Sequence, residues 1–142
     1  MPGSEGQTTE IQSLARSLRM MFAAMFVACA LYIVVLVELA DQIEPHPLGV
    51  WLNALRALAV FLAGGVLYVR FVLIARILGT DDLRPRIPKL RVYYVLSYVL
   101  CEAIALGGFA LRFAGGSFNA ALPFFGAAVL LFALCYPKFD WT

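Results

Sequence analysis

Four long apolar stretches constrain this chain more than any other feature of its sequence. They cover residues 20–39, 50–74, 92–111 and 118–136. A helix needs about 20 mostly apolar residues to cross the roughly 30 Å hydrocarbon core of a bilayer. The stretches lack the alternation of barrel strands and are too long for them. The sequence therefore predicts an all-α fold, a four-helix transmembrane bundle.

The composition excludes several other classes of protein. Of the 142 residues, 63% are hydrophobic and 14% are charged, whereas a soluble domain is about 45–50% apolar and about 25% charged. A core of this size cannot hide so much apolar surface. This excludes an ordinary soluble domain, a disordered chain and a nucleic-acid-binding protein.

The segments between the apolar stretches are too short to form a second domain. We therefore expect residues 1–142 to form a single integral membrane domain, with residues 1–19 as a polar tail and an interfacial segment. The first apolar stretch exceeds the usual 7–15 residues of a signal peptide and ends without a small-x-small cleavage site. It is therefore interpreted as a retained helix.

The basic residues between the stretches predict the orientation of the chain. Arg16 and Arg19 precede the first stretch, Lys138 follows the fourth, and Arg112 lies between the third and fourth. The loop between the second and third stretches holds Arg76, Arg84, Arg86, Lys89 and Arg91. Because basic residues favour the cytoplasmic side, we expect both termini and this loop to be cytoplasmic, with the protein in the cell (inner) membrane. These loop residues either have the single role of determining the orientation of the chain or also bind anionic lipid headgroups.

Glu102 lies near the centre of the third stretch, about 15 Å from Arg91 at one end and from Arg112 at the other. An acidic side chain at this depth costs about 2.5–3.5 kcal/mol by insertion scales. The carboxyl group must therefore be paired, protonated or in contact with water. Glu102 is the candidate ion-binding residue of the chain.

The second stretch offers possible polar partners for Glu102. At 100° per residue, Asn53, Arg56, Ala63 and Arg70 share one helix face. We expect Arg56 to turn inward towards Glu102, and Arg70 to reach the headgroups near the inner end. Two interpretations stay open: a buried ion pair that fixes the helix register, or a proton-binding carboxylate whose charge Arg56 tunes.

Small residues form a seam on the third stretch and a pair on the second. Ala103, Gly107 and Ala110 follow one stripe, and Gly64 and Gly65 are adjacent. Such residues let helices approach closely in lipid. They predict either packing within the bundle or a face for self-association.

The hairpin from residue 59 to residue 113 resembles the proteolipid (subunit c) family of rotary ATP synthases. In that family a glycine-bearing helix leads through a polar loop to a second helix with a carboxylate at mid-membrane. Gly64-Gly65, Arg84-Pro85 and the string from Glu102 to Gly107 stand in those places here. The resemblance implies that Glu102 is a proton- or ion-binding carboxylate.

No set of residues points to a cofactor, a metal or an enzyme. His46 is the single histidine, and the three cysteines lie in apolar stretches without a CxxC pattern. A membrane enzyme is the third class considered, and the lack of any nucleophile–base or metal-ligand set speaks against it. The sequence favours a non-enzymatic structural or accessory subunit, in contact with the lipid bilayer and with copies of itself or other membrane-protein subunits. The alternative is a proton- or ion-translocating subunit that uses Glu102.

Overall fold

The chain is entirely helical wherever it has regular structure in the part that the structure describes. This computed structural model describes residues 4–39, 41–44, 46–79 and 84–137, so Lys138 and the first residues of the expected tail lie outside it. The elements are α1 (Ser4–Glu38), α2 (Val50–Tyr68), the π-helical turn η1 (Val69–Ile74), α3 (Ala75–Leu78), the 3-10 turn η2 (Arg84–Arg86), α4 (Ile87–Phe113) and α5 (Phe118–Leu134). The expected all-α class and the four main helices are confirmed.

Three of the helical segments are long and apolar enough to cross a membrane. They are Thr9–Glu38, Val50–Leu78 and Ile87–Phe113. Helix α5 is equally apolar, but its 17 residues extend only about 26 Å. It is therefore shorter than the roughly 30 Å hydrocarbon core that a spanning helix must cross.

Helix α1 begins earlier than the sequence analysis expects. The segment expected to be a polar tail and a separate interfacial helix continues the same helix from Ser4 onward. Leu14 and Leu18 are buried in this segment. Their apolar contacts explain why the helix extends beyond the first apolar stretch.

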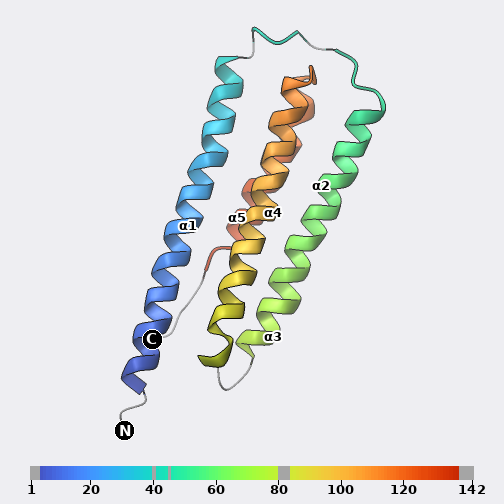
Figure 1. Ribbon diagram of the computed structural model, residues 1–142. Coiled ribbons are helices and arrows are strands. Elements are labelled where there is room, and N and C mark those ends of the chain that lie inside the picture. Colours follow the sequence, from blue (N-terminus) through green and yellow to red (C-terminus); the bar gives the residue numbers. More distant parts are fainter. Residues whose placement is uncertain (1–3, 40, 45, 80–83, 138–142) are drawn as a thin grey trace.

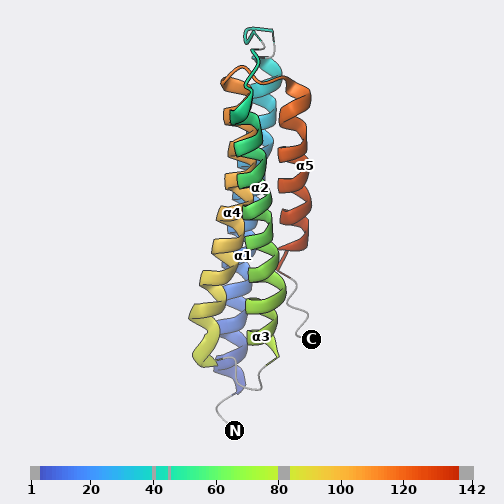
Figure 2. The same cartoon turned by 90° about the vertical axis from the view of Figure 1, so that its right-hand side faces the viewer.

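Helix α4 is the central helix of the bundle. It packs against α1, α2 and α5. Figure 1 shows α1 and α2 on opposite sides of α4, and Figure 2 shows α5 against another side of the group. Helices α1 and α2 pack mainly against α4 and make few contacts with each other. A side chain on α4 can therefore face one of these two helices and point away from the other.

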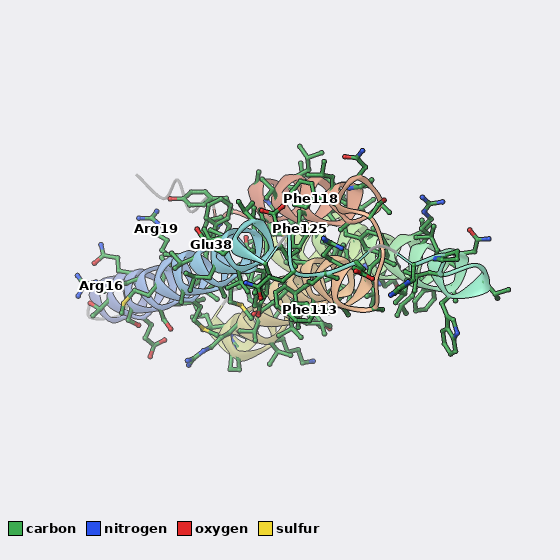
Figure 3. The ribbon with its side chains drawn as sticks, turned by 90° about the horizontal axis from the view of Figure 1, so that it is seen from above. Arg16, Arg19, Glu38, Phe113, Phe118 and Phe125 are labelled. Carbon is green, nitrogen blue, oxygen red and sulfur yellow. The ribbon has the colours of Figure 1, made fainter. Side chains whose placement is uncertain are left out.

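One end of the molecule, which we name the basic end, holds the start of α1, helix α3, turn η2 and the start of α4 (Figure 1). Its described basic residues are Arg16, Arg19, Arg76, Arg84, Arg86, Lys89 and Arg91. Figure 3 shows Arg16 and Arg19 pointing away from the other helices. The opposite end holds the end of α1, the start of α2 and the turn from α4 to α5.

The turn from α4 to α5 follows from its local sequence. Gly115 has a φ of 94°, a conformation that favours glycine. The N–H of Gly116 donates to the carbonyl of Leu111, and the N–H of Gly115 donates to that of Arg112. This pattern is a Schellman motif, which ends α4. The hydroxyl of Ser117 then accepts from the N–H of Ala120 and caps the start of α5.

The closest approach of α4 and α5 occurs at Gly108. A Cβ atom built there would lie 2.7 Å from Cβ of Phe124 and 3.2 Å from the carbonyl oxygen of Ala121. Only glycine fits this separation. The sequence analysis did not single out Gly108.

The residues expected to form the packing seams are distributed over several environments. Gly107 faces α5, and Gly65 of α2 faces α4, both at ordinary contact distance. A Cβ atom at Gly64 would meet nothing within 4 Å. Ala103 is half-buried and Ala110 is exposed. The stripe on α4 therefore turns partly towards α5 and partly outward.

Candidate functional site

The carboxyl group of Glu102 binds a hydroxyl group from the neighbouring helix. The hydroxyl of Tyr32 on α1 donates to Oε1 of Glu102 on α4 at 3.0 Å. Glu102 is half-buried, midway along α4. The hydrogen bond joins α1 to α4 and gives this half-buried carboxyl group a partner, without which its burial would be costly. Sequence reasoning located Glu102 but missed Tyr32 as its partner.

The ring of Tyr32 is held by a second contact. Its centroid lies 5.4 Å from that of Phe109, which is about two turns beyond Glu102 along α4. Cys29, on the same side of α1 as Tyr32, is buried against the bundle. The hydroxyl of Tyr32 is therefore positioned by packing between α1 and α4.

The structure does not bring Arg56 to Glu102. The part of the chain that the structure describes shows no ion pair between them, and the Arg56 side chain is exposed on α2. The cause is the arrangement of the helices: Glu102 faces α1, and α2 lies on the opposite side of α4 (Figure 1). The expected pairing of Arg56 with Glu102 is corrected to a pairing of Tyr32 with Glu102.

Arg56 instead lines an apolar groove between α2 and α5. Ala63, two turns further along α2, lines the same groove. Asn53, one turn before Arg56, is exposed. Of the residues expected to share this face, Arg56 and Ala63 line the groove, whereas Asn53 does not.

Arg70, which was expected to reach the headgroups, forms a hydrogen bond with the end of α5. Its Nε donates to the carbonyl oxygen of Leu134 at 3.1 Å. Its guanidinium carbon also lies 5.9 Å from the ring centroid of Tyr94 on α4. The last carbonyl groups of a helix lack donors within it and attract cations. Arg70 therefore caps α5 where this short helix ends.

A π-helical turn interrupts the long helix at Arg70. The buried residues around it are Val66, Val69, Ile74 and Ile77, at intervals of three, five and three. In a regular α-helix the interval of five would rotate Ile74 about 140° off the buried face. The wider π turn takes up the extra residue and keeps that face towards the bundle. The sequence carried no signal for this turn, because residues 66–78 are apolar apart from Arg70 and Arg76.

Further polar side chains line the buried side of α4 between Arg70 and Glu102. Ser97, Tyr98 and Cys101 are fully buried there. The thiol of Cys135, directly after α5, lies beside the thiol of Cys101 and the hydroxyl of Ser97. The hydroxyl of Tyr98 has no hydrogen-bond partner among the described residues. We name Ser97, Tyr98, Cys101 and Cys135 the polar strip.

Arg112 ties the two connections at the opposite end together. It is only 4% exposed. Its Nη1 donates to the carbonyl of Gly116 at 3.1 Å and its Nη2 to that of Ile43 at 3.0 Å. The N–H of His46 donates to the carbonyl of Gly115 at 2.7 Å in the same region. Sequence reasoning used Arg112 only for orientation; an arginine three residues before the glycine pair Gly115-Gly116 was the signal for this role.

The described residues contain no group of three or more His, Cys, Asp or Glu side chains that could hold a metal ion. Comparison with family models, with curated proteins and with solved structures finds no match for this chain. Functional conclusions therefore rest on the geometry described above.

Proposed function

We propose that this chain is a multi-pass protein of the cell (inner) membrane that acts as a non-enzymatic accessory subunit of a membrane complex. In this proposal α1, α2 with α3, α4 and α5 cross the bilayer, and the basic end is cytoplasmic. The gathering of Arg16, Arg19 and Arg91 at one end of the bundle supports this orientation. It agrees with the apolar character of the three long helices.

The observation that carries the proposal is the large apolar surface that α1 and α2 leave uncovered. Within its most apolar window, α1 buries 11% of its residues and the α2–α3 segment 17%, against 44% for α4. Phe61 on α2 is 78% exposed and Leu31 on α1 is 56% exposed. These helices contact mainly α4. What the chain offers to another membrane protein is therefore the outer surface of α1 and α2.

Site-directed photo-crosslinking in native membranes tests this role. A photoreactive residue placed at Leu31 or Phe61 should give a discrete protein adduct. The matched control is Ile104, which is 1% exposed inside the bundle and should give none. Absence of a protein adduct at both exposed positions would contradict the proposed subunit role.

The orientation has its own test. Single cysteines at His46 and Arg86, in a background without the natural cysteines, should react with a membrane-impermeant reagent from opposite sides. These residues lie at opposite ends of the bundle. Labelling of both from the same side would refute the proposed topology.

A second candidate function is proton or ion binding at Glu102. The polar strip favours it, because hydroxyl and thiol groups follow α4 from the level of Arg70 towards Glu102. A buried hydroxyl such as that of Tyr98 ordinarily binds a water molecule. The resemblance of the hairpin to subunit c gives Glu102 the same role. In this candidate, protons reach Glu102 from the basic end.

Proton flux into vesicles containing the purified protein tests the candidate. Glu102→Gln should abolish the flux, because an amide cannot take up and release the proton at neutral pH. Glu38→Gln, at the exposed end of α1, is the matched control and should retain it. Equal flux in the wild type and in Glu102→Gln would eliminate this function and leave the accessory role.

A further inference from the structure

An open groove runs between α2 and α5 on the outside of the bundle. Its volume is about 370 Å³, within the range of small-molecule sites. Ala59 and Ala63 of α2 and Pro123 and Ala127 of α5 line it. Small side chains on both helices keep it open, and Arg56 supplies its charged group. From Arg56 to Ala63 it follows α2 for about 10 Å.

Arg56 gives the groove a chemical polarity. Its side chain is exposed, and no hydrogen bond or ion pair holds it within the part of the chain that the structure describes. A helical side chain leans towards the N-terminus of its helix, so Arg56 leans towards the end of the bundle opposite the basic end. Asn53 lies one turn further in that direction on the same face and is also exposed.

In the proposed membrane orientation, the charged end of the groove lies nearer the membrane surface than its apolar end, like the head and tail of a lipid. Arg56 lies about two turns inside the start of α2, at the depth where an arginine reaches the level of the phosphates. Ala63 and Ala127 lie deeper along their helices, where acyl chains extend. A cation at the outer end of an apolar groove is complementary to a molecule with an anionic head and an apolar tail.

We propose that this groove binds one anionic phospholipid, with its phosphate on Arg56 and an acyl chain between α2 and α5. The proposal rests on the membrane insertion proposed above. Asn53 can donate a further hydrogen bond to the headgroup. The binding is selective for anionic over zwitterionic headgroups, because the net charge of the lipid faces an arginine that forms no ion pair within the part of the chain that the structure describes.

Native mass spectrometry of the full chain released from nanodiscs tests the proposal. The nanodiscs contain phosphatidylglycerol and phosphatidylcholine in equal amounts. Wild type and Arg56→Lys should retain phosphatidylglycerol preferentially, and Arg56→Gln should lower that preference about fivefold. Arg76→Gln, an exposed arginine at the basic end of the same long helix, is the matched control and should keep the wild-type preference.

A variant in the apolar part separates the headgroup from the acyl chain. Ala63→Phe fills the groove and should reduce retention of both lipids. An unchanged preference in Arg56→Gln would overturn the proposal, and so would a second copy of the chain or another protein bound in place of lipid. Failure to enter nanodiscs would instead refute the membrane insertion on which the accessory role rests, so the two failures are distinguishable.

Discussion

The hydrogen bond between Tyr32 and Glu102 predicts a measurable coupling between α1 and α4. Tyr32→Phe removes the hydroxyl that donates to Oε1 at 3.0 Å, while the ring keeps its contact with Phe109. Interhelical hydrogen bonds in membrane proteins contribute about 0.6 kcal/mol on average and about 1.7 kcal/mol at most. We therefore expect Tyr32→Phe to lower the free energy of unfolding by an amount in this range.

A double-mutant cycle isolates the hydrogen bond from other effects of the substitutions. The free energy of unfolding is measured by denaturant titration in mixed micelles, followed by circular dichroism, for Tyr32→Phe, Glu102→Leu and the double variant. Removing both partners should cost less than the sum of the single changes, with a coupling of about 0.6–1.7 kcal/mol. Glu102→Gln keeps an acceptor oxygen and should preserve most of the stabilisation.

The control cycle pairs Arg56→Gln with Glu102→Leu. The structure places no contact between these side chains, so their effects should add to within about 0.5 kcal/mol. Additive effects of Tyr32→Phe and Glu102→Leu would refute the hydrogen bond. Strong coupling of Arg56 with Glu102 would show that α2 lies against the Glu102 face of α4, contrary to the arrangement described here.

Two further predictions concern the contacts of α5 and use the same unfolding assay. Arg70→Gln removes the cation from the C-terminal carbonyl of α5 and should lower the free energy of unfolding by about 1 kcal/mol. Arg76 is exposed, so the control Arg76→Gln should change this free energy by less than about 0.5 kcal/mol. Equal effects of the two substitutions would show that Arg70 does not cap α5. Gly108→Ala places a Cβ atom 2.7 Å from Cβ of Phe124 and should cost about 1–3 kcal/mol. Gly64→Ala, whose Cβ meets nothing within 4 Å, should instead stabilise the helix by up to about 1 kcal/mol, so the same sign for both substitutions would contradict the close approach at Gly108.

The helices could be predicted from the sequence because long apolar stretches leave few alternatives in a bilayer. The expected stretch 50–74 corresponds to a helical segment that ends at Leu78, and 92–111 corresponds to Ile87–Phe113. The ends differ because polar residues such as Lys89 and Arg91 also favour helix, with Pro88 tolerated in the first turn of α4. Hydropathy marks the apolar part of a helix and not the whole of it.

The neighbours of each helix could not be predicted in the same way. Depth and rotation place Glu102 at the centre of α4, but they do not say which helix lies on that side. The expected partner Arg56 assumed that α2 faces Glu102, whereas α1 does and supplies Tyr32. The regular rotation that relates Arg56 to Ala63 also changes from Val69 onward, where the π turn begins. One extra residue hardly changes the composition of the stretch, so the composition does not reveal the π turn.

The contacts of Arg70 and Arg112 support the proposal that Arg56 binds a lipid. Arg70 and Arg112 both donate to main-chain carbonyl groups at helix ends, at Leu134 and at Gly116. A carbonyl acceptor avoids the desolvation of a buried carboxylate, which would offset much of the gain from an ion pair. Arg56 makes no such bond within the part of the chain that the structure describes, and its groove is otherwise lined by apolar side chains. The proposed lipid phosphate would supply to Arg56 the acceptor that main-chain carbonyl groups supply to Arg70 and Arg112.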